Sequence, residues 1–290
     1  MKGIVLAGGR GTRLSPITTS VSKQLLPVFD KPLVYYPIST LMLAGIKEIS
    51  IITTPQDQPL FQKLLKNGSQ LGVSFTFLIQ DEPKGIAEAF IIAENFIEDS
   101  NVALILGDNI FHGSGIGRNL TNFTSEDAAR IMAFRVQNPE DFGVVEMDIS
   151  NNPIRIIEKP KKFSGNLAIP GLYFYGSDVV KKAKRLKPSE RGELEISSIN
   201  QEYLDEGRLR VNILPRGTSW FDGGTAESLH EAGEYIRVIE KRQGLKIGCL
   251  EEISWRNGWI ASDELRDLGL AIPGSEYGKY LVRLSEGEFN

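Results

Sequence analysis

The stretch GIVLAGGRGTRLSPITTSVSKQLLPV, residues 3–28, begins with an apolar run that ends in a glycine-rich turn. The run predicts a strand at 3–7, and the turn and the segment after it carry the cations Arg10, Arg13 and Lys23. Glycines let a ligand approach the backbone, and clustered cations repel one another unless an anion lies among them. The stretch therefore predicts a strand followed by an anion-binding loop, although an ordinary turn with solvated arginines fits the turn alone equally well.

The same alternation of elements continues outward from this stretch. Further strands are predicted at 48–54, 73–80 and 102–108, with helices at 33–44, 58–66 and 86–97 between them. The runs ISIITT and VALILGD lack period-2 alternation, which is typical of strands buried on both faces of a parallel sheet. The second half predicts strands at 129–136, 144–148, 154–158, 172–175 and 209–214, and helices at 177–186, 193–206 and 226–242. We expect one large α/β domain with a mixed sheet, followed by a C-terminal helical appendage.

Composition excludes several classes of protein. The chain has 290 residues, 41% of them hydrophobic, and a net charge of −4, which gives no general reason to bind nucleic acid or an anionic membrane. The N-terminal apolar run is too short for a signal peptide, and no run reaches the roughly 18 residues of a membrane span. Cys249 is the single cysteine, so an internal disulfide is excluded and a zinc site is disfavoured. We expect a cytoplasmic protein.

Two familiar phosphate-binding loops do not fit the glycine-rich turn. A Walker A loop needs lysine directly after its second spaced glycine, where this chain has Gly9. A dinucleotide fingerprint starting at Gly9 would need its third glycine at Leu14.

Other strand ends add candidate groups. Ligands of open α/β sheets lie beyond the carboxyl ends of strands, which directs attention to 8–13, 80–85, 107–109 and 158–160. Asp108, Asp222 and Glu158 follow or end such segments, and each alone has an ordinary alternative as a helix cap, a turn residue or an exposed ion pair. Together with the cations they supply what phosphoryl transfer needs.

The motifs LAGGRGTRLSPIT, SKQLLPVFDKPLVYYPISTLMLAGI, LGDNIFHG, FGVVEMD, EKP, GLYFY, RGELEI and WFDGGT follow in order from residue 6 to 225. With them the chain resembles the sugar-1-phosphate nucleotidyltransferase family over nearly its whole length. The resemblance implies a Rossmann-like three-layer fold with a mixed, mostly parallel central sheet and a C-terminal helical appendage. It implies a nucleotidyltransferase domain at 1–242, with a nucleotide-binding half at about 1–110 and a sugar-phosphate-binding half at about 111–242. A helical tail then covers 243–290.

The segments STLMLAGI and PQDQP point to the thymidylyl branch of the family. The resemblance implies formation of dTDP-glucose and pyrophosphate from dTTP and glucose 1-phosphate with Mg²⁺, for deoxysugar biosynthesis of the dTDP-rhamnose type, by a homotetramer. Uridylyl transfer or another hexose 1-phosphate remains an alternative. A glycosyltransferase would commonly carry an Asp-x-Asp motif, and none occurs in the sequence. An inactive sensor of nucleotide sugars would have lost Arg13, Lys23 or Asp108, and all are present.

The resemblance also implies roles for individual residues. Arg13, Lys23, Asp108, Lys159 and Asp222 would act in catalysis, with Asp108 and Asp222 as the Mg²⁺ ligands. The nucleotide would contact Leu6, Gly8, Gly9, Gly11, Thr12, Arg13, Gln24, Gln80, Gly85 and Asp108. The sugar phosphate would contact Gly143, Glu158, Lys159, Ile169, Tyr173 and Trp220.

Two of these roles have a physical argument of their own. The amides of Gln24 and Gln80 offer a donor and an acceptor, which suits the imide edge of thymine or uracil and mismatches cytosine.

Neighbouring strand residues point to opposite faces, and Pro160 restricts Lys159 to extended conformations. We therefore expect Glu158 and Lys159 to serve different parts of the sugar phosphate.

Overall fold

The fold is built on a ten-stranded mixed sheet, with strand order β10-β9-β11-β8-β12-β6-β1-β4-β5 and with β13 paired to β8. The computed structural model describes residues 1–9, 11–121, 129–161 and 165–288. In the first half, β1 (Lys2–Ala7), β4 (Glu48–Thr53), β5 (Ser74–Ile79) and β6 (Val102–Leu106) pair in parallel. In the second half, antiparallel pairing dominates among β8 (Ala129–Arg135), β9 (Gly143–Met147), β10 (Pro153–Glu158), β11 (Leu167–Ala168) and β12 (Leu172–Tyr175), and only β13 (Leu209–Ile213) pairs in parallel.

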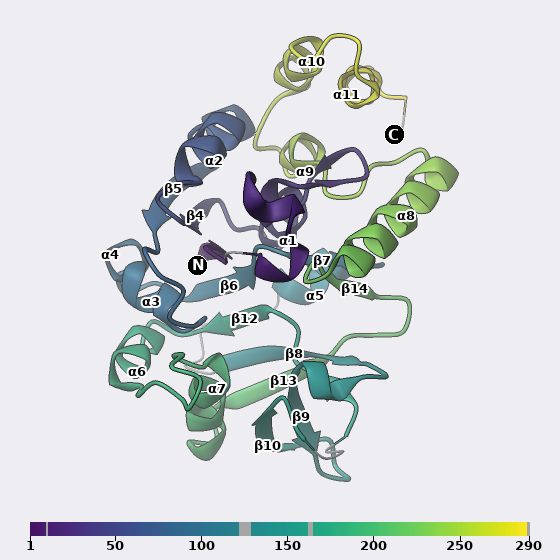
Figure 1. Cartoon of the computed structure of the whole chain (residues 1–290). Helices are drawn as coiled ribbons and strands as arrows, with labels where there is room; N and C mark the ends of the chain where they lie inside the picture. Colours follow the sequence, from purple (N-terminus) through teal and green to yellow (C-terminus); the bar gives the residue numbers. More distant parts are fainter. Residues whose placement is uncertain (10, 122–128, 162–164, 289–290) are drawn as a thin grey trace.

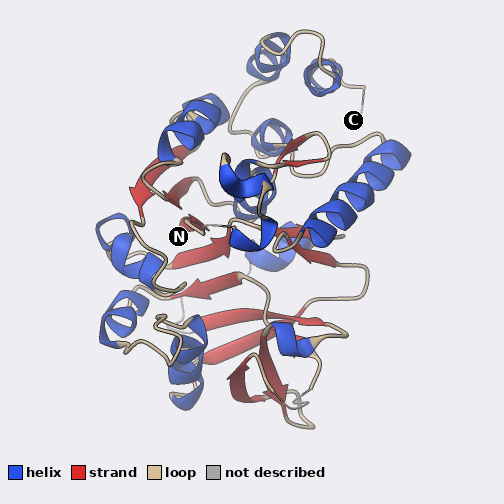
Figure 2. Ribbon diagram, in the orientation of Figure 1, coloured by secondary structure: helices blue, strands red, loops and turns tan. Residues whose placement is uncertain are grey.

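Helices cover both faces of this sheet (Figures 1 and 2). In chain order they are α1 (Tyr35–Leu43), α2 (Gln58–Leu65), α3 (Glu88–Ile92), α4 (Glu94–Ile97), α5 (Ile116–Thr121), α6 (Val179–Arg185), α7 (Ile196–Asp205) and α8 (Ala226–Gln243). Along β1, Ile4 belongs to the apolar core under α3, α6 and α7, whereas its neighbour Val5 belongs to the core under α1 and α2. Both side chains are fully buried. The three-layer α/β fold and the doubly buried strands are therefore confirmed.

Several predicted boundaries are wrong in an informative way. The predicted helix at 86–97 is divided into α3 and α4, and it starts late because the Ala87 amide donates to the Leu194 carbonyl (3.2 Å). The predicted helix at 193–206 begins only at Ile196, because the Leu194 amide donates to the Lys84 carbonyl (2.7 Å). Contacts between two distant loops thus replace the first turn of each helix.

Two short ribbons were not predicted. β2 (Pro27–Val28) pairs with β3 (Lys31–Pro32), and β7 (Asn109–His112) pairs with β14 (Ser219–Asp222). The predicted strand at 102–108 stops at Leu106, and β7 starts after a turn at Gly107 and Asp108. In the β7–β14 ribbon Asn109 lies opposite Asp222, so Asp108 and Asp222 come together at one end.

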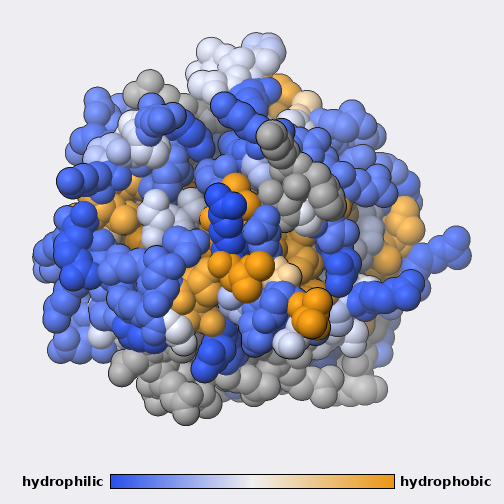
Figure 3. All heavy atoms as spheres, turned by 90° about the horizontal axis from the view of Figure 1, so that it is seen from below, coloured by the Kyte–Doolittle hydropathy of each residue, from blue (hydrophilic) through white to orange (hydrophobic). Residues whose placement is uncertain are grey.

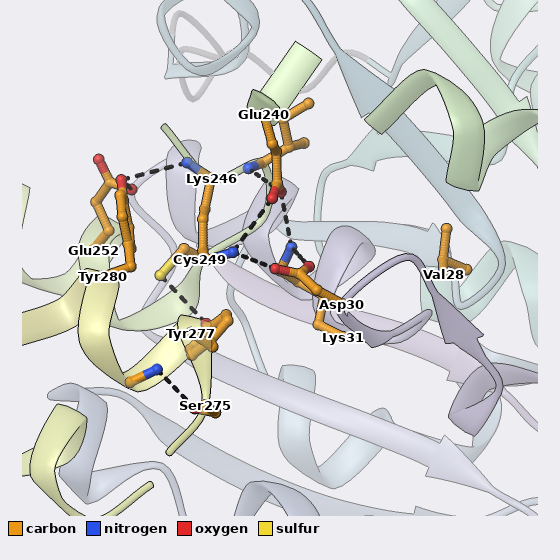
Figure 4. A network of polar contacts seen from close by, with 12 residues as sticks. Val28, Asp30, Lys31, Glu240, Lys246, Cys249, Glu252, Ser275, Tyr277 and Tyr280 are labelled. Atoms are coloured by element: carbon orange, nitrogen blue, oxygen red, sulfur yellow. Dashed lines mark hydrogen bonds and ion pairs between the residues drawn. The ribbon is translucent and has the colours of Figure 1, made fainter. Parts of the chain in front are cut away.

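The C-terminal tail forms the helices α9 (Leu250–Arg256), α10 (Ser262–Leu270) and α11 (Glu276–Ser285), at the top of Figure 1. A buried polar network joins it to the β2–β3 turn and to α8 (Figure 4). The Lys31 ammonium contacts Asp30 and Glu240, and the Lys246 ammonium contacts the same two carboxylates. Tyr280 donates to Glu252 across the tail (2.6 Å). The tail is therefore attached by charges as well as by apolar packing.

Lys31 is the member of this network whose loss should cost the most. Its side chain is 2% exposed, and it lies 3.0 Å from Glu240, which is itself buried. Lys31→Met removes the nearest ammonium from the buried Glu240 carboxylate, so the free energy of unfolding should fall by about 3 kcal/mol. Lys279→Met is the matched control, because Lys279 and Glu276 are exposed and their pair should contribute under about 1 kcal/mol. Equal stability of the two variants in urea titrations would contradict the assignment.

The molecular surface has one further feature on the side of β9 and β10. Figure 3 shows an apolar area there, framed by hydrophilic side chains. Exposed apolar side chains of the second half include Ile149, Ile154 and Ile213. Large contiguous apolar areas on a protein surface commonly mark interaction sites.

Within the described residues, no helix combines the length and the apolar character needed to cross a bilayer.

Candidate functional site

A cavity of about 260 Å³ lies where the two halves of the sheet meet. Nine of the predicted site residues border it: Arg13, Asp108, Gly143, Glu158, Lys159, Ile169, Tyr173, Trp220 and Asp222. The other predicted residues (Leu6, Gly8, Gly9, Gly11, Thr12, Lys23, Gln24, Gln80 and Gly85) are not part of the described lining. Several of the latter are nevertheless connected to it by direct contacts.

The glycine-rich loop is folded against the segment that carries Lys23. Gly11 has φ +60°, and a Cβ there would lie 3.0 Å from Thr18 and 3.3 Å from Lys23. The Thr18 hydroxyl donates to the Gly11 carbonyl (2.8 Å). The positive φ and this close approach both favour glycine here, and the loop places Lys23 beside it. Arg10 lies outside the described residues.

Lys23 forms an ion pair with Asp108. Burial alone would raise the pKa of Asp108, but the Lys23 ammonium and a hydrogen bond from Asn109 lower it below its usual value. Asp108 is therefore an ionised carboxylate at the edge of the cavity, although it lies in a largely buried position.

Asn109 is an orienting residue that the sequence did not identify. Its amide donates to Asp108 (2.8 Å), and its Oδ1 accepts from the Trp220 indole (2.7 Å) and from the Gly171 amide (3.0 Å). With 2% exposure, Asn109 is held on three sides. Trp220 also packs against Phe142, with ring centroids 5.0 Å apart. The β7–β14 ribbon therefore fixes both the carboxylate and one aromatic wall.

Asp222 and Arg13 lie together at the same end of this ribbon. A Cβ at Gly224 would be 2.8 Å from Arg13 Nη2 and 3.1 Å from Asp222 Oδ2. Burial, and next the charge of Asp108, raise the pKa of Asp222 to about 6, against the lowering effect of Arg13. Two carboxylates in such proximity repel each other, which is the condition that a bound cation relieves.

The far end of the cavity is lined by β9, β10, β12 and the start of α7. Glu158 Oε2 would lie 3.2 Å from a Cβ at Gly143, so the absence of a side chain there leaves room beside the carboxylate. Burial and the nearby Glu195 raise the pKa of Glu158, and a hydrogen bond with Ser197 opposes that rise. Tyr173 is 3% exposed, and burial followed by the charges of Glu158 and Asp108 raises its pKa. This end therefore offers hydrogen-bond acceptors and a hydroxyl.

The expectation that Lys159 is extended is wrong. Lys159 has φ +43°, although its amide still donates to the carbonyl of Phe142, the residue before β9 (3.0 Å). One hydrogen bond beyond the end of β10 thus holds this residue while the backbone turns into the left-handed region before Pro160. A lysine in this region is strained, and such strain is held where the surrounding contacts determine the conformation. Both Glu158 and Lys159 border the same cavity.

The loop at 187–195 contributes three further charged residues that sequence reasoning did not assign: Arg191, Glu193 and Glu195. The Ser189 hydroxyl donates to Glu195 (2.8 Å), and the Ser189 amide donates to the Glu193 carbonyl (2.9 Å). Arg191 lies 3.1 Å from Glu193. Arg191 also lies 3.8 Å from Glu158, for which the family resemblance implies a sugar-phosphate contact, and we therefore call residues 189–195 the hexose loop. The motif RGELEI was the available signal, but it did not show that these side chains meet Glu158.

Gly85 supports this loop rather than bordering the cavity. It has φ +107°, and a Cβ there would lie 2.4 Å from the Leu194 carbonyl oxygen and 2.5 Å from the Leu194 nitrogen. No side chain fits at this position without displacing the hexose loop. The close approach therefore explains the glycine in structural terms.

Gly85→Ala should displace the hexose loop and leave the glycine-rich loop intact. For the substrates that the family resemblance implies, we expect the KM for the sugar phosphate to rise about tenfold or more, in the range of 1–3 kcal/mol for disturbed buried contacts. The KM for the nucleotide should change less. Gly207→Ala is a control, because nothing lies within 4 Å of a Cβ there and φ is also positive. A larger change in the nucleotide KM would instead favour the nucleotide contact implied by the family resemblance.

The two glutamines predicted to read the base are both buried, each with 3% exposure. Gln24 accepts from Ser22 (2.9 Å), and Gln80 donates to Glu88 (2.7 Å). Gln80 Oε1 lies where a side chain at Gly8 would project, 2.4 Å from such a Cβ. Gln80 and the glycine-rich loop are therefore in direct contact.

Comparisons with known proteins find relatives over nearly the whole chain. The family model described as nucleotidyl transferase matches residues 2–238. The glucose-1-phosphate thymidylyltransferase of Neisseria meningitidis serogroup A is 51% identical over 285 residues, covering 98% of this chain and 99% of that protein. The enzyme of the same name from Mycobacterium tuberculosis is 51% identical over 286 residues, covering 99% of each.

Solved structures show the same fold. A candidate glucose-1-phosphate thymidylyltransferase of Bacillus anthracis, crystallised with sucrose, superposes with a TM-score of 0.76 at 40% identity, covering 82% of this chain and 95% of that chain. A UDP-glucose pyrophosphorylase crystallised with UDP-glucose superposes with a TM-score of 0.73 at 22% identity, covering 83% of this chain and 99% of that chain. At that lower identity the likeness concerns the fold alone.

Proposed function

This chain belongs to the nucleotidyl transferase family, and from that premise we propose that it forms dTDP-glucose and pyrophosphate from dTTP and glucose 1-phosphate. The observation that carries the proposal is the meeting of Arg13, Asp108 and Asp222 with Glu158 and Lys159 around one cavity. Relatives with about half of their residues identical, matched over nearly their full length, are named for this reaction.

The proposed chemistry is an in-line displacement at the α-phosphorus of dTTP. An oxygen of the sugar phosphate forms the new bond to this phosphorus, and the bond to the bridging oxygen of the leaving pyrophosphate breaks. The sugar phosphate is already an anion, so the step requires no general base. It requires positioning and neutralisation of two anions that repel each other.

The proposal gives each of three cations a part in that task. Lys159 would hold the sugar phosphate, Lys23 would neutralise charge near the α-phosphate, and Arg13 would bind the leaving pyrophosphate with its planar fork. Backbone amides of Gly8, Gly9, Gly11 and Thr12 would hold the triphosphate, as oriented amide groups do in anion-binding loops.

The site fits Mg²⁺ as an oxygen-liganding cation. Asp108 and Asp222 approach closely enough for the charge of one to raise the pKa of the other. Mg²⁺ is commonly held by one or two carboxylates together with substrate phosphates. We propose Asp108 and Asp222 as its ligands. Bound there, the ion would supply charge neutralisation at the phosphates.

At the sugar end, Glu158 would accept hydrogen bonds from hexose hydroxyls, next to Gly143, Ile169, Tyr173 and Trp220. The proposal also includes the homotetramer that the resemblance implies, and the apolar area in Figure 3 is consistent with an interface. Sedimentation velocity measures that assembly directly. Residues 1–242 and 243–290 remain our proposed division into transferase domain and tail.

A panel of nucleoside triphosphates against hexose 1-phosphates, read by pyrophosphate release, tests the proposed function. We expect the highest kcat/KM for dTTP with glucose 1-phosphate. Higher kcat/KM with UTP would make the chain a uridylyltransferase. Pyrophosphate release that does not depend on any sugar phosphate would contradict the proposal.

A further inference from the structure

The carboxylate of Glu88 connects the base-reading side of the site to the hexose loop. Glu88 is the first residue of α3 and is half-buried. One of its oxygens, Oε2, accepts from Gln80 Nε2 (2.7 Å) and from the Lys84 backbone amide (3.2 Å). Lys84 in turn accepts from the Leu194 amide (2.7 Å). A continuous run of hydrogen bonds thus joins Gln80 to the hexose loop through one side chain.

The contact with Glu88 determines which way the Gln80 amide faces. An ionised carboxylate only accepts, so the group that it contacts on Gln80 must be the amide nitrogen. The oxygen of that amide then lies on the other side, against Gly8. The terminal torsion of glutamine is broad and roughly two-fold, so without such a partner the oxygen and the nitrogen can exchange places.

This orientation matters for the choice of base. The N3 position of thymine carries a hydrogen and needs an acceptor, whereas N3 of cytosine is itself an acceptor. The Gln80 oxygen faces Gly8, one of the nucleotide contacts that the family resemblance implies, and an amide oxygen fixed on that side favours thymine. An amide that rotates freely offers its nitrogen equally well. A buried donor or acceptor left without a partner costs about 1–3 kcal/mol, and sites built on such pairings discriminate strongly.

We propose that Glu88 is a positioning residue that sets nucleotide preference by fixing the orientation of the Gln80 amide. The same carboxylate holds Lys84, whose carbonyl accepts from the hexose loop. The inference rests on the proposed function, and it takes from the amide chemistry of Gln80 the prediction that this residue reads the base. Glu88 itself contacts no substrate in this account. Its role is to make one orientation of its neighbour the stable one.

Calorimetric binding of dTTP and of dCTP, without sugar phosphate, measures this preference independently of turnover. In Glu88→Ala the ratio of the two dissociation constants should move toward unity by about tenfold or more. Glu88→Gln should fall between the wild type and Glu88→Ala, because an amide at 88 pairs with either orientation of Gln80. Glu94→Ala is the matched control: Glu94 opens α4 and pairs with Lys184 at 48% exposure of both side chains. Its ratio should equal that of the wild type.

A merely structural role predicts a different result. Loss of packing or of loop stability would weaken the binding of dTTP and the binding of dCTP by the same factor. The ratio of the two dissociation constants would then stay unchanged. An unchanged ratio in Glu88→Ala, with thermal melting showing a folded protein, would overturn the inference. A normal preference for dTTP in binding, combined with no release of pyrophosphate by the wild type, would contradict the proposed function and not this role of Glu88.

Discussion

Asp108→Asn should lower kcat by about two orders of magnitude or more, the range expected for losing one strong electrostatic contact at a reacting phosphate. The substitution keeps the shape of the side chain and removes the charge that faces Lys23 and Asp222. In the proposed mechanism that charge holds Mg²⁺ and balances the approach of two anions. Steady-state kinetics at saturating Mg²⁺ and both substrates measure the effect.

A loss of folding must be separated from a loss of catalysis in this variant. Lys23 is buried to 8% exposure, so its charge loses a partner in Asp108→Asn. Thermal melting followed by circular dichroism gives the temperature range in which the variant remains folded, and the kinetics belong in that range. Asp263→Asn, at an exposed position on α10, is the control. A kcat of Asp108→Asn within about threefold of that control would contradict the catalytic role proposed for Asp108.

Arg13→Lys is expected to have the second largest effect, a fall in kcat of about tenfold to a hundredfold. Lysine keeps the charge but cannot bind two phosphate oxygens with a planar fork. Arg13 Nη2 and Asp222 Oδ2 both lie beside Gly224, so the guanidinium is close to a proposed Mg²⁺ ligand.

The reverse reaction isolates the role proposed for Arg13. With dTDP-glucose saturating, the KM for pyrophosphate should rise in Arg13→Lys, because pyrophosphate is the group that the fork binds. Arg216→Lys, at an exposed position far along the chain, should behave as the wild type. An unchanged KM for pyrophosphate would leave only a diffuse electrostatic role for Arg13.

The central parallel strands could be predicted from the sequence because they are buried on both faces of the sheet. Ile4 and Val5 are neighbours that pack into opposite cores, so polar side chains are disfavoured on both faces of this strand. Continuous apolar runs are the direct result, and they can be read without knowledge of the partners. Asp108, at the end of one such run, could be identified for the same reason.

The remaining features depend on contacts between distant segments. Asn109 and Asp222 face each other across the β7–β14 ribbon, yet neither NIFH nor SWFD is long enough to predict a strand. The hexose loop meets Gly85 and Lys84 through backbone atoms, which leave no pattern in side-chain chemistry. Lys159 precedes a proline and should be extended by local rules, but its φ is +43°. Tertiary contacts outweigh local preference at each of these positions.

The most direct test of the central claim follows one labelled oxygen. The chain is incubated with Mg²⁺, unlabelled dTTP and glucose 1-phosphate carrying ¹⁸O in its phosphate, and the products are identified by ³¹P NMR and mass spectrometry. The account predicts dTDP-glucose with the label retained on the phosphate attached to glucose, and an equal amount of unlabelled pyrophosphate. Formation of dTMP and pyrophosphate without a sugar nucleotide, or of label in the pyrophosphate, would contradict it.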